Sequence, residues 1–139
     1  MASTTSIPSR VTITVRAKGA SPEGLCVCLR FEMRSKNTFS YVAFLDSQGT
    51  ASASREELLR VFDEERHAFI MDYDDPRIAF SGKITAKLLS PAELKSALEA
   101  FQMFRGKLSF PDNYEERLKA ALRRGQKPDE CQLEMITTS

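Results

Sequence analysis

The side chains in this chain of 139 residues that could carry out nucleophilic or acid–base chemistry are one histidine and three cysteines. Any histidine-based mechanism would use His67, because the sequence holds no other histidine. A nucleophilic cysteine needs a base within hydrogen-bond reach, but Cys26 and Cys28 fall inside a strand-like segment and Cys131 falls near the C-terminus. The alternative role for His67 is structural, since a histidine near a helix C-terminus is favoured by the helix dipole. We therefore predict no catalytic residue and no enzymatic activity.

Four aspartates could offer oxygen ligands to a hard cation such as Ca²⁺. Asp72, Asp74 and Asp75 are close in sequence, and Asp46 lies in another turn. The alternative is that Asp74-Asp75-Pro76 is ordinary turn chemistry. The sequence has neither the regular ligand spacing of a calcium loop nor a glycine loop for phosphate. We expect no metal and no cofactor, and Asp72, Asp74 and Asp75 are the candidate ligands should a metal bind.

The strongest candidates for a binding role are apolar. Aromatic and aliphatic side chains crowd the link between two expected C-terminal helices, more densely than a short connection normally requires, at Phe101, Met103, Phe104, Leu108 and Phe110. One interpretation is that these side chains pack on the sheet of the same chain. The other is a surface for a partner protein or for self-association. In the second case, Phe101, Phe104 and Phe110 are the predicted binding residues.

Composition excludes two classes of partner. Hydrophobic residues make up 42% of the chain and charged residues 28%, as in an ordinary globular protein. The formal net charge of +1 provides no field that would attract nucleic acid or an anionic membrane. Basic residues near the C-terminus, such as Arg117 and Lys119, accompany Glu115 and Glu116, which favours a solvated helix face.

The cysteines and the N-terminus indicate the compartment. Three cysteines is an odd number, and Cys26 and Cys28 would lie two apart on one strand face, which is a poor geometry for a disulfide. They also lack the C-x-x-C spacing of a zinc site. The first residues contain no basic start and no apolar run, and no segment approaches the ~20 apolar residues of a membrane span. We expect a cytoplasmic protein that does not bind membranes.

Hydrophobic periodicity predicts a run of strands and then a run of helices. Apolar residues alternate, as in strands with one buried face, within residues 11–15, 25–33, 38–45, 69–73 and 84–88. A polar turn at residues 46–49 leads to a capped helix at about residues 55–65. Ser90-Pro91 and Asp112-Asn113 open two further helices, and Gly125 ends the second of them.

These segments define the expected domain organisation and fold class. We predict a flexible N-terminus at residues 1–8, a single globular domain at residues 9–125 and a flexible tail at residues 126–139. Within the domain, residues 9–89 are β-rich and residues 90–125 are helical. The fold class is mainly β with α additions. The prediction is a β-sandwich-like domain of five to six or more strands, with one helix inserted after the third strand and two C-terminal helices.

One stretch resembles a known family. The run Gly24-Leu25-Cys26-Val27-Cys28-Leu29, then Phe39 and then Leu45-Asp46-Ser47-Gln48-Gly49-Thr50-Ala51, is similar to the transthyretin-like sandwich of carboxypeptidase regulatory-like domains. There, an apolar strand is followed by a D-x-x-G turn that enters the next strand. The resemblance covers residues 9–89, and the helix after the turn and the two C-terminal helices depart from it. It implies a non-catalytic module that binds or supports other proteins.

The sequence thus leaves two functions open. The first is a non-catalytic protein-interaction or accessory module, which acts on another protein or on a second copy through an apolar surface or a sheet edge. The second is a small enzyme or ligand-binding protein, whose pocket lies between the sheet and the C-terminal helices with His67, Asp72, Asp74 and Asp75 at its mouth.

Overall fold

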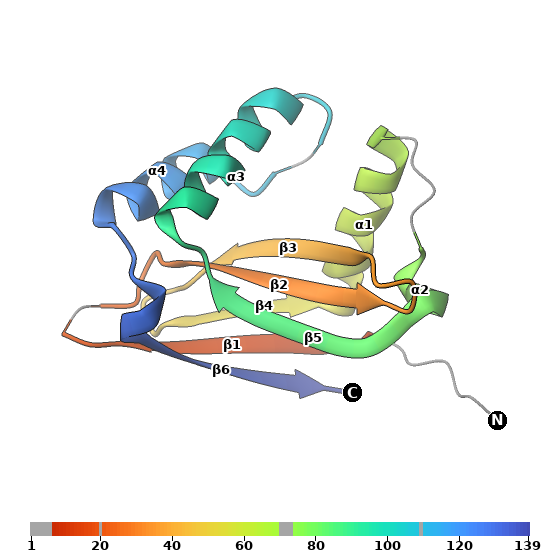
Figure 1. The fold of residues 1–139 in the computed structure, drawn as a ribbon, viewed down its shortest axis with the longest axis horizontal. Helices are drawn as coiled ribbons and strands as arrows, with labels where there is room; N and C mark the ends of the chain where they lie inside the picture. The colour runs from red at the N-terminus through yellow and green to blue at the C-terminus, as the bar shows by residue number, and fades with distance from the viewer. Residues whose placement is uncertain (1–6, 20, 70–73, 109) are drawn as a thin grey trace.

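The computed structural model describes residues 7–19, 21–69, 74–108 and 110–139. These residues form a mixed α/β fold of two three-stranded sheets with four α-helices and one 3-10 helix (Figure 1). The elements follow one another as β1 (Arg10–Ala17), β2 (Cys26–Met33), β3 (Thr38–Phe44), β4 (Thr50–Ser54), α1 (Arg55–Phe69), α2 (Pro76–Ala79), β5 (Phe80–Leu88), α3 (Pro91–Phe104), α4 (Tyr114–Arg124), η1 (Pro128–Glu130) and β6 (Cys131–Thr138).

Both sheets are antiparallel, and each has a strand from the N-terminal region at its centre. One sheet has the order β4-β1-β6 and the other the order β3-β2-β5. Strands β3, β4, β5 and β6 are therefore the edges. The expected fold class is confirmed in its coarse form, with six described strands and helical additions, but the two helices predicted at the C-terminal end, α3 and α4, are followed by η1 and β6.

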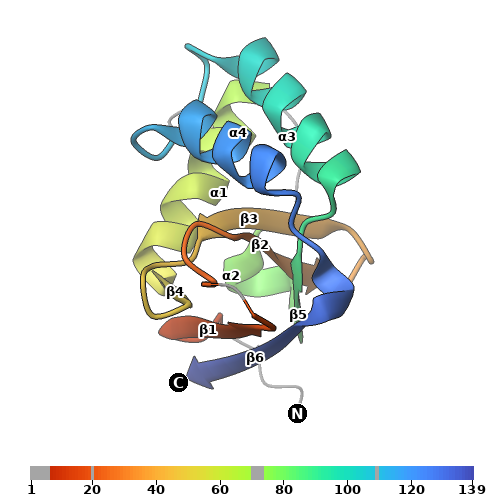
Figure 2. The same ribbon diagram turned by 90° about the vertical axis from the view of Figure 1, so that its left-hand side faces the viewer.

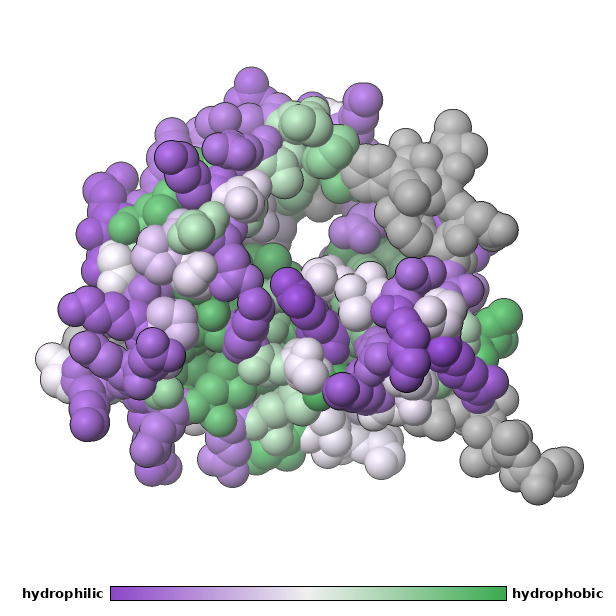
Figure 3. Space-filling model, viewed as in Figure 1, coloured by the Kyte–Doolittle hydropathy of each residue, from purple (hydrophilic) through white to green (hydrophobic). Residues whose placement is uncertain are grey.

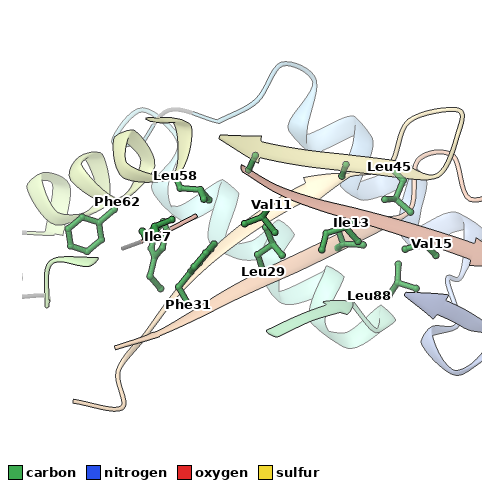
Figure 4. Packing of buried hydrophobic residues seen from close by; sticks show 14 of the residues in the cluster. Ile7, Val11, Ile13, Val15, Leu29, Phe31, Leu45, Leu58, Phe62 and Leu88 are labelled. Carbon is green, nitrogen blue, oxygen red and sulfur yellow. The ribbon is translucent and has the colours of Figure 1, made fainter. Parts of the chain in front are cut away.

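The main core is built from side chains of both sheets. Val11, Ile13 and Val15 alternate along β1 and are buried, as the period of two requires. They belong to one cluster with Leu29 and Phe31 of β2 (Figure 4). Helix α1 contributes its apolar stripe to the same cluster through two buried side chains, Leu58 and Phe62.

A second, smaller cluster lies between the β3-β2-β5 sheet and the two C-terminal helices, which cover that sheet on one side (Figure 2). The alternate residues of β2, Cys26 and Cys28, point into it, together with Val42 of β3. Leu94 of α3 and Leu118 of α4 are fully buried opposite them. Each face of β2 is thus covered, which explains why six of its eight residues are apolar and buried.

The turn between β3 and β4 forms as the sequence predicts. The Asp46 side chain accepts hydrogen bonds from the backbone N–H groups of Gln48 and Thr50. Gly49 has a φ of +76°, and a Cβ atom there would lie 2.6 Å from the carbonyl oxygen of Val15. Only glycine fits this position, because both the backbone conformation and the neighbouring strand exclude a side chain.

The helix signals are confirmed at most termini. Ser90 and Glu93 form a reciprocal capping box at the start of α3. Gly125 ends α4 in the left-handed conformation, and its N–H bonds back to Ala121 and Leu122. The cap predicted from Asp112-Asn113-Tyr114-Glu115 differs, since the N-cap is Asn113, which has a φ of 59° and makes no capping hydrogen bond through its side chain.

Two predictions about the middle of the chain need correction. The inserted helix α1 follows the fourth strand rather than the third, because residues 50–54 form β4 against β1. Small alternating side chains in Thr50–Ser54 gave too weak a pattern to stand out as a strand. The strand predicted at residues 69–73 is wrong at Phe69, which belongs to α1, and its other residues lie outside those described.

The prediction of a flexible C-terminal tail is also wrong. Residues 131–138 form β6, which pairs with β1 along all eight of its residues. Gln126, just before this strand, is 3% exposed. At the other end, Ile7 is 2% exposed and belongs to the main core, so the prediction of a flexible N-terminus is wrong at this residue. Residues 1–6 lie outside the described part.

In the part of the chain that the structure describes, no helix is both long and apolar enough to cross a membrane.

Candidate functional site

The most distinctive feature of the surface is the outer edge of β3. Among the described residues, β3 pairs with β2 on one side and with no strand on the other. The Leu45 N–H, which continues this strand, donates to the Leu25 carbonyl at 2.9 Å. In an antiparallel pair, the backbone N–H and C=O groups of every second residue point toward the same neighbouring strand. Tyr41 lies four residues before Leu45, so its backbone groups also point toward β2. Ser40 and Val42 therefore direct their backbone N–H and C=O groups to the free edge.

A cleft of about 450 Å³ lies along this edge. Its floor is formed by Ser40, Tyr41 and Val42 of β3. Helix α1 forms one wall, and the connection between α3 and α4 with the start of α4 forms the other (Figure 1). An opening is visible in this region near the middle of the space-filling view (Figure 3). The cleft thus exposes a row of strand backbone between two helical walls.

A second hollow, of about 210 Å³, continues the first. Both are lined by Ser40 and Glu65, and the second also contacts Thr38 at the start of β3 and Asp74 before α2. The two hollows together follow the β3 edge from Thr38 to Val42. At about 3.4 Å per residue, this length of edge matches an extended segment of roughly five residues.

The wall on the α3–α4 side is aromatic. Phe110 stacks on Phe101 at 4.8 Å between ring centroids and on Tyr114 at 5.1 Å. Tyr114 also meets Phe44 of β3 edge to face, and the guanidinium of Arg117 lies 5.4 Å above the Phe44 ring. Rings packed in this way are held rigidly, so the wall offers a fixed apolar surface to the cleft.

The wall on the α1 side is acidic. Glu57, Glu64 and Glu65 line the cleft, against one basic residue, Arg60. The hydroxyl of Tyr41 donates to a carboxylate oxygen of Glu57 at 3.5 Å. Burial raises the pKa of Tyr41, and the nearby Glu57 carboxylate raises it further. Tyr41 therefore stays a hydrogen-bond donor at neutral pH.

Glu65 has the most unusual carboxyl group of the cleft. Burial raises its pKa from 4.5 to about 7, and no cation among the described residues offsets the effect. A carboxyl group that titrates near neutral pH inside a cleft is typical of functional sites. Ionised Glu65 is poorly solvated in the free protein, so a cation brought into the cleft would favour its charged form.

This pKa predicts how Glu65 affects stability. The folded state favours neutral Glu65 more than the unfolded chain does, so ionisation of this carboxyl group lowers the free energy of unfolding. This loss of stability is absent below pH 4.5 and complete above pH 7. We expect Glu65→Gln to stabilise the protein by ~2 kcal/mol at pH 8, since one pKa unit is about 1.4 kcal/mol and partial exposure lowers the effect. Urea unfolding at pH 8 and at pH 4 measures it, with exposed Glu56→Gln as the control. A gain that is equal at both pH values would contradict the assignment.

The predicted binding residues lie next to this cleft. Phe110 lines it directly, and Phe101 packs behind Phe110 in the helical cluster. Phe104 is half-buried near the end of α3, while its neighbour Met103 is 69% exposed. The structure thus brings Phe101 and Phe110 together with Tyr114. Whether they contact a partner stays a prediction.

The predicted chemistry-bearing residues lie apart from one another. His67 is exposed on α1 and is not among the described residues that line the cleft. Asp74 lines the second hollow and bonds to Ser35, whereas Asp75 caps α2 and pairs with Arg77. Asp72 lies outside the described residues. Among those described, no group of three or more histidine, cysteine or acidic side chains is placed to hold a metal ion.

The cysteines are held in their thiol form. All three are free. Burial raises the pKa of Cys26 to about 12, and burial also raises those of Cys28 and Cys131. Since the thiolate is the nucleophile, these positions are unsuited to covalent chemistry.

Sequence reasoning missed the residues that build the cleft, Ser40, Glu57, Glu64 and Glu65. The sequence did contain one signal, since a strand followed by an amphipathic helix with four glutamates on it could have suggested an acidic wall. The free edge carried no signal, because strand order is not encoded locally.

No protein-family model matches this chain, and no match was found among curated proteins or solved structures. The case for a function therefore depends on the cleft itself.

Proposed function

We propose that the protein is a non-catalytic interaction module that binds an extended segment of a partner protein as an added strand at the β3 edge. The observation that carries this proposal is the backbone of Ser40 and Val42 on the floor of a cleft, which pairs with no other strand of the described chain. An exposed edge pairs readily with another strand. Added strands gain affinity from the main chain and specificity from pockets for alternate side chains.

Three further features support this proposal. The cleft is long and open, as an extended chain requires, rather than enclosed around a small molecule. Its aromatic wall, built on Phe110 and Tyr114, is rigid and could hold apolar anchors of the segment. Neither His67 nor any of the three cysteines is among the described residues that line the cleft.

A proline at Ser40 tests the proposal. Proline has no N–H and its ring blocks a neighbouring strand, but it is tolerated where the N–H of an edge strand faces outward. Peptides of about ten residues would be selected from a random display library on the wild-type protein. We expect Ser40→Pro to weaken their binding by roughly tenfold or more, since one edge hydrogen bond is worth about 1 kcal/mol and the ring adds a clash.

The matched control is Ser40→Ala, which removes the hydroxyl and keeps the N–H. It should bind the selected peptides as the wild type does. Calorimetric titration gives the affinities, and thermal melting shows that each variant is folded. Equal binding to wild type, Ser40→Ala and a folded Ser40→Pro would contradict strand addition.

A second candidate, a ligand-binding protein or small enzyme, is favoured by Glu65. A carboxyl group with a pKa of about 7 could act as a general acid or base in a cleft between the sheet and the C-terminal helices. In that case, a small molecule would bind without using the β3 backbone. Ser40→Pro would leave its binding unchanged, and Glu65→Gln would abolish its turnover or weaken its binding.

We also propose that the two sheets form a β-sandwich, as the resemblance to transthyretin-like domains implies. One cluster of buried side chains drawn from both sheets supports this arrangement. The resemblance itself stays a prediction. A reducing compartment such as the cytoplasm is proposed as well, supported by three free cysteines.

A further inference from the structure

The pleat of β3 determines where the side chains of an added strand would point. Along β3, Phe39 is buried in the core between the sheets, and Tyr41 packs against that core on the α1 side. Val42 and Phe44 point the other way, into the cluster under α3 and α4. Side chains of paired strands alternate in step. A segment added beside β3 would therefore send alternate side chains toward α1 and toward the aromatic wall.

The wall of the cleft on the α1 side is strongly acidic at the place that side chains of an added strand would reach. Of the described residues that line the two hollows, four are acidic, Glu57, Glu64, Glu65 and Asp74, and one is basic, Arg60. Other charges of α1 are already paired away from the cleft, such as Asp63 with Arg77. Glu57 and Asp74 accept hydrogen bonds from neighbours of the same chain, whereas Glu64 and Glu65 have no cationic partner among the described residues.

The opposite side is apolar. Leu108, Phe110, Pro111 and Tyr114 line the cleft there. Burial raises the pKa of Tyr114 well above its usual range, so this ring carries no charge at any physiological pH. No acidic or basic side chain from this side is among the described residues that line the cleft. A charged side chain directed here would lose its hydration without gaining a partner.

We propose that the segment bound at the β3 edge is a basic one, in which lysine or arginine residues that face α1 alternate with apolar residues that face the aromatic wall. This inference rests on the proposed function and specifies its partner. Complementary charge sets which segments bind and in which register, since a shift by one residue would bring apolar side chains to the carboxylates and basic ones to the rings.

Three synthetic peptides test the inference. The first alternates lysine and valine over six residues, the second alternates glutamate and valine, and the third has the composition of the first with its three lysines and three valines in separate blocks. We expect the alternating lysine peptide to bind at least about tenfold more tightly than either of the others at low salt, and its affinity to fall as salt is added.

Variants of the protein connect this preference to the cleft. Glu64→Gln with Glu65→Gln should reduce the affinity for the alternating lysine peptide by about tenfold, while Glu56→Gln, on the exposed side of α1, should leave it unchanged. Should the double variant be unfolded, Glu64→Gln alone provides the same comparison. Equal affinity for all three peptides, together with loss of binding in Ser40→Pro, would overturn the charge preference and retain strand addition. Binding that Ser40→Pro leaves intact, or no binding of any peptide, would overturn both.

Discussion

A chain that ends at Gly125 is expected to lose roughly 5 kcal/mol or more of folding stability, which is comparable to the whole stability of a small domain. The deletion removes β6, whose eight residues pair with β1, and also Gln126 with its buried hydrogen bonds. It also uncovers the β1 edge and the partly buried Leu133 and Met135 contacts with the main core. Urea unfolding followed by circular dichroism measures the loss.

Ile136→Ser is the matched control for this deletion. This side chain is 55% exposed on β6, so its replacement should change stability by no more than about 0.5 kcal/mol. The control distinguishes the stability that β6 contributes as a strand of the sheet from the contribution of one apolar side chain that does not reach the core. A truncated chain that unfolds at the same urea concentration as the full chain would show that β6 contributes nothing to the fold.

The second large effect is expected at Gln126. Its side-chain carbonyl accepts from the Cys26 N–H at 3.0 Å, and its amide donates to the carbonyl oxygens of Cys26 and Leu89. Gln126 thus bonds to backbone groups at the first residue of β2 and just after the last residue of β5, where the pairing between these two strands ends. Gln126→Ala leaves two buried polar groups without partners, the Cys26 N–H and the Leu89 carbonyl oxygen, because the Cys26 carbonyl oxygen still accepts from the Leu89 N–H at 3.1 Å. Each such group is worth about 1 to 3 kcal/mol, and we expect a loss of ~2 to 4 kcal/mol.

Gln126→Glu isolates the two donated bonds. A carboxylate can still accept from Cys26, but it cannot donate to either carbonyl oxygen, and its charge is buried. We expect it to be at least as destabilising as Gln126→Ala at pH 7, measured by thermal melting. A glutamate variant with wild-type stability would mean that the donated bonds are of no importance.

The parts of the fold that the sequence predicts well are those with strong local patterns. The alternation of Val11, Ile13 and Val15, the capping box at Ser90 and Glu93 and the turn at Asp46 all form as expected. Each of them depends on neighbours within a few residues. Local signals of this kind are independent of the order in which strands pair.

The C-terminal strand was missed although its pattern is present. Leu133 and Met135 alternate with Gln132 and Glu134, but three of the last four residues are polar and the segment follows a proline-containing stretch. This strand is stabilised by pairing with β1, which lies at the opposite end of the chain. A local sequence pattern cannot predict pairing between such distant segments. Gln126 was missed for the same reason, since its partners lie in β2 and β5.

The candidate site was predicted only in part. The aromatic density around Phe101 and Phe110 falls in one wall of the cleft, since Phe110 lines it. The binding role of Phe101, Phe104 and Phe110 stays a prediction. The other wall comes from α1 and the floor from β3, so the site exists only after strands and helices from three regions meet. The free edge of Ser40 and Val42 is a property of strand order, which this sequence does not specify locally.

Amide hydrogen exchange measured residue by residue, with and without the alternating lysine–valine peptide, tests the central claim most directly. In the free protein, the N–H groups of Tyr41 and Ala43 bond to β2, whereas those of Ser40 and Val42 face the open edge. Binding should slow exchange at Ser40 and Val42 by about tenfold or more and leave Tyr41 and Ala43 nearly unchanged. Bound peptide with no added protection at Ser40 and Val42, or with equal protection at all four residues, would contradict strand addition at β3.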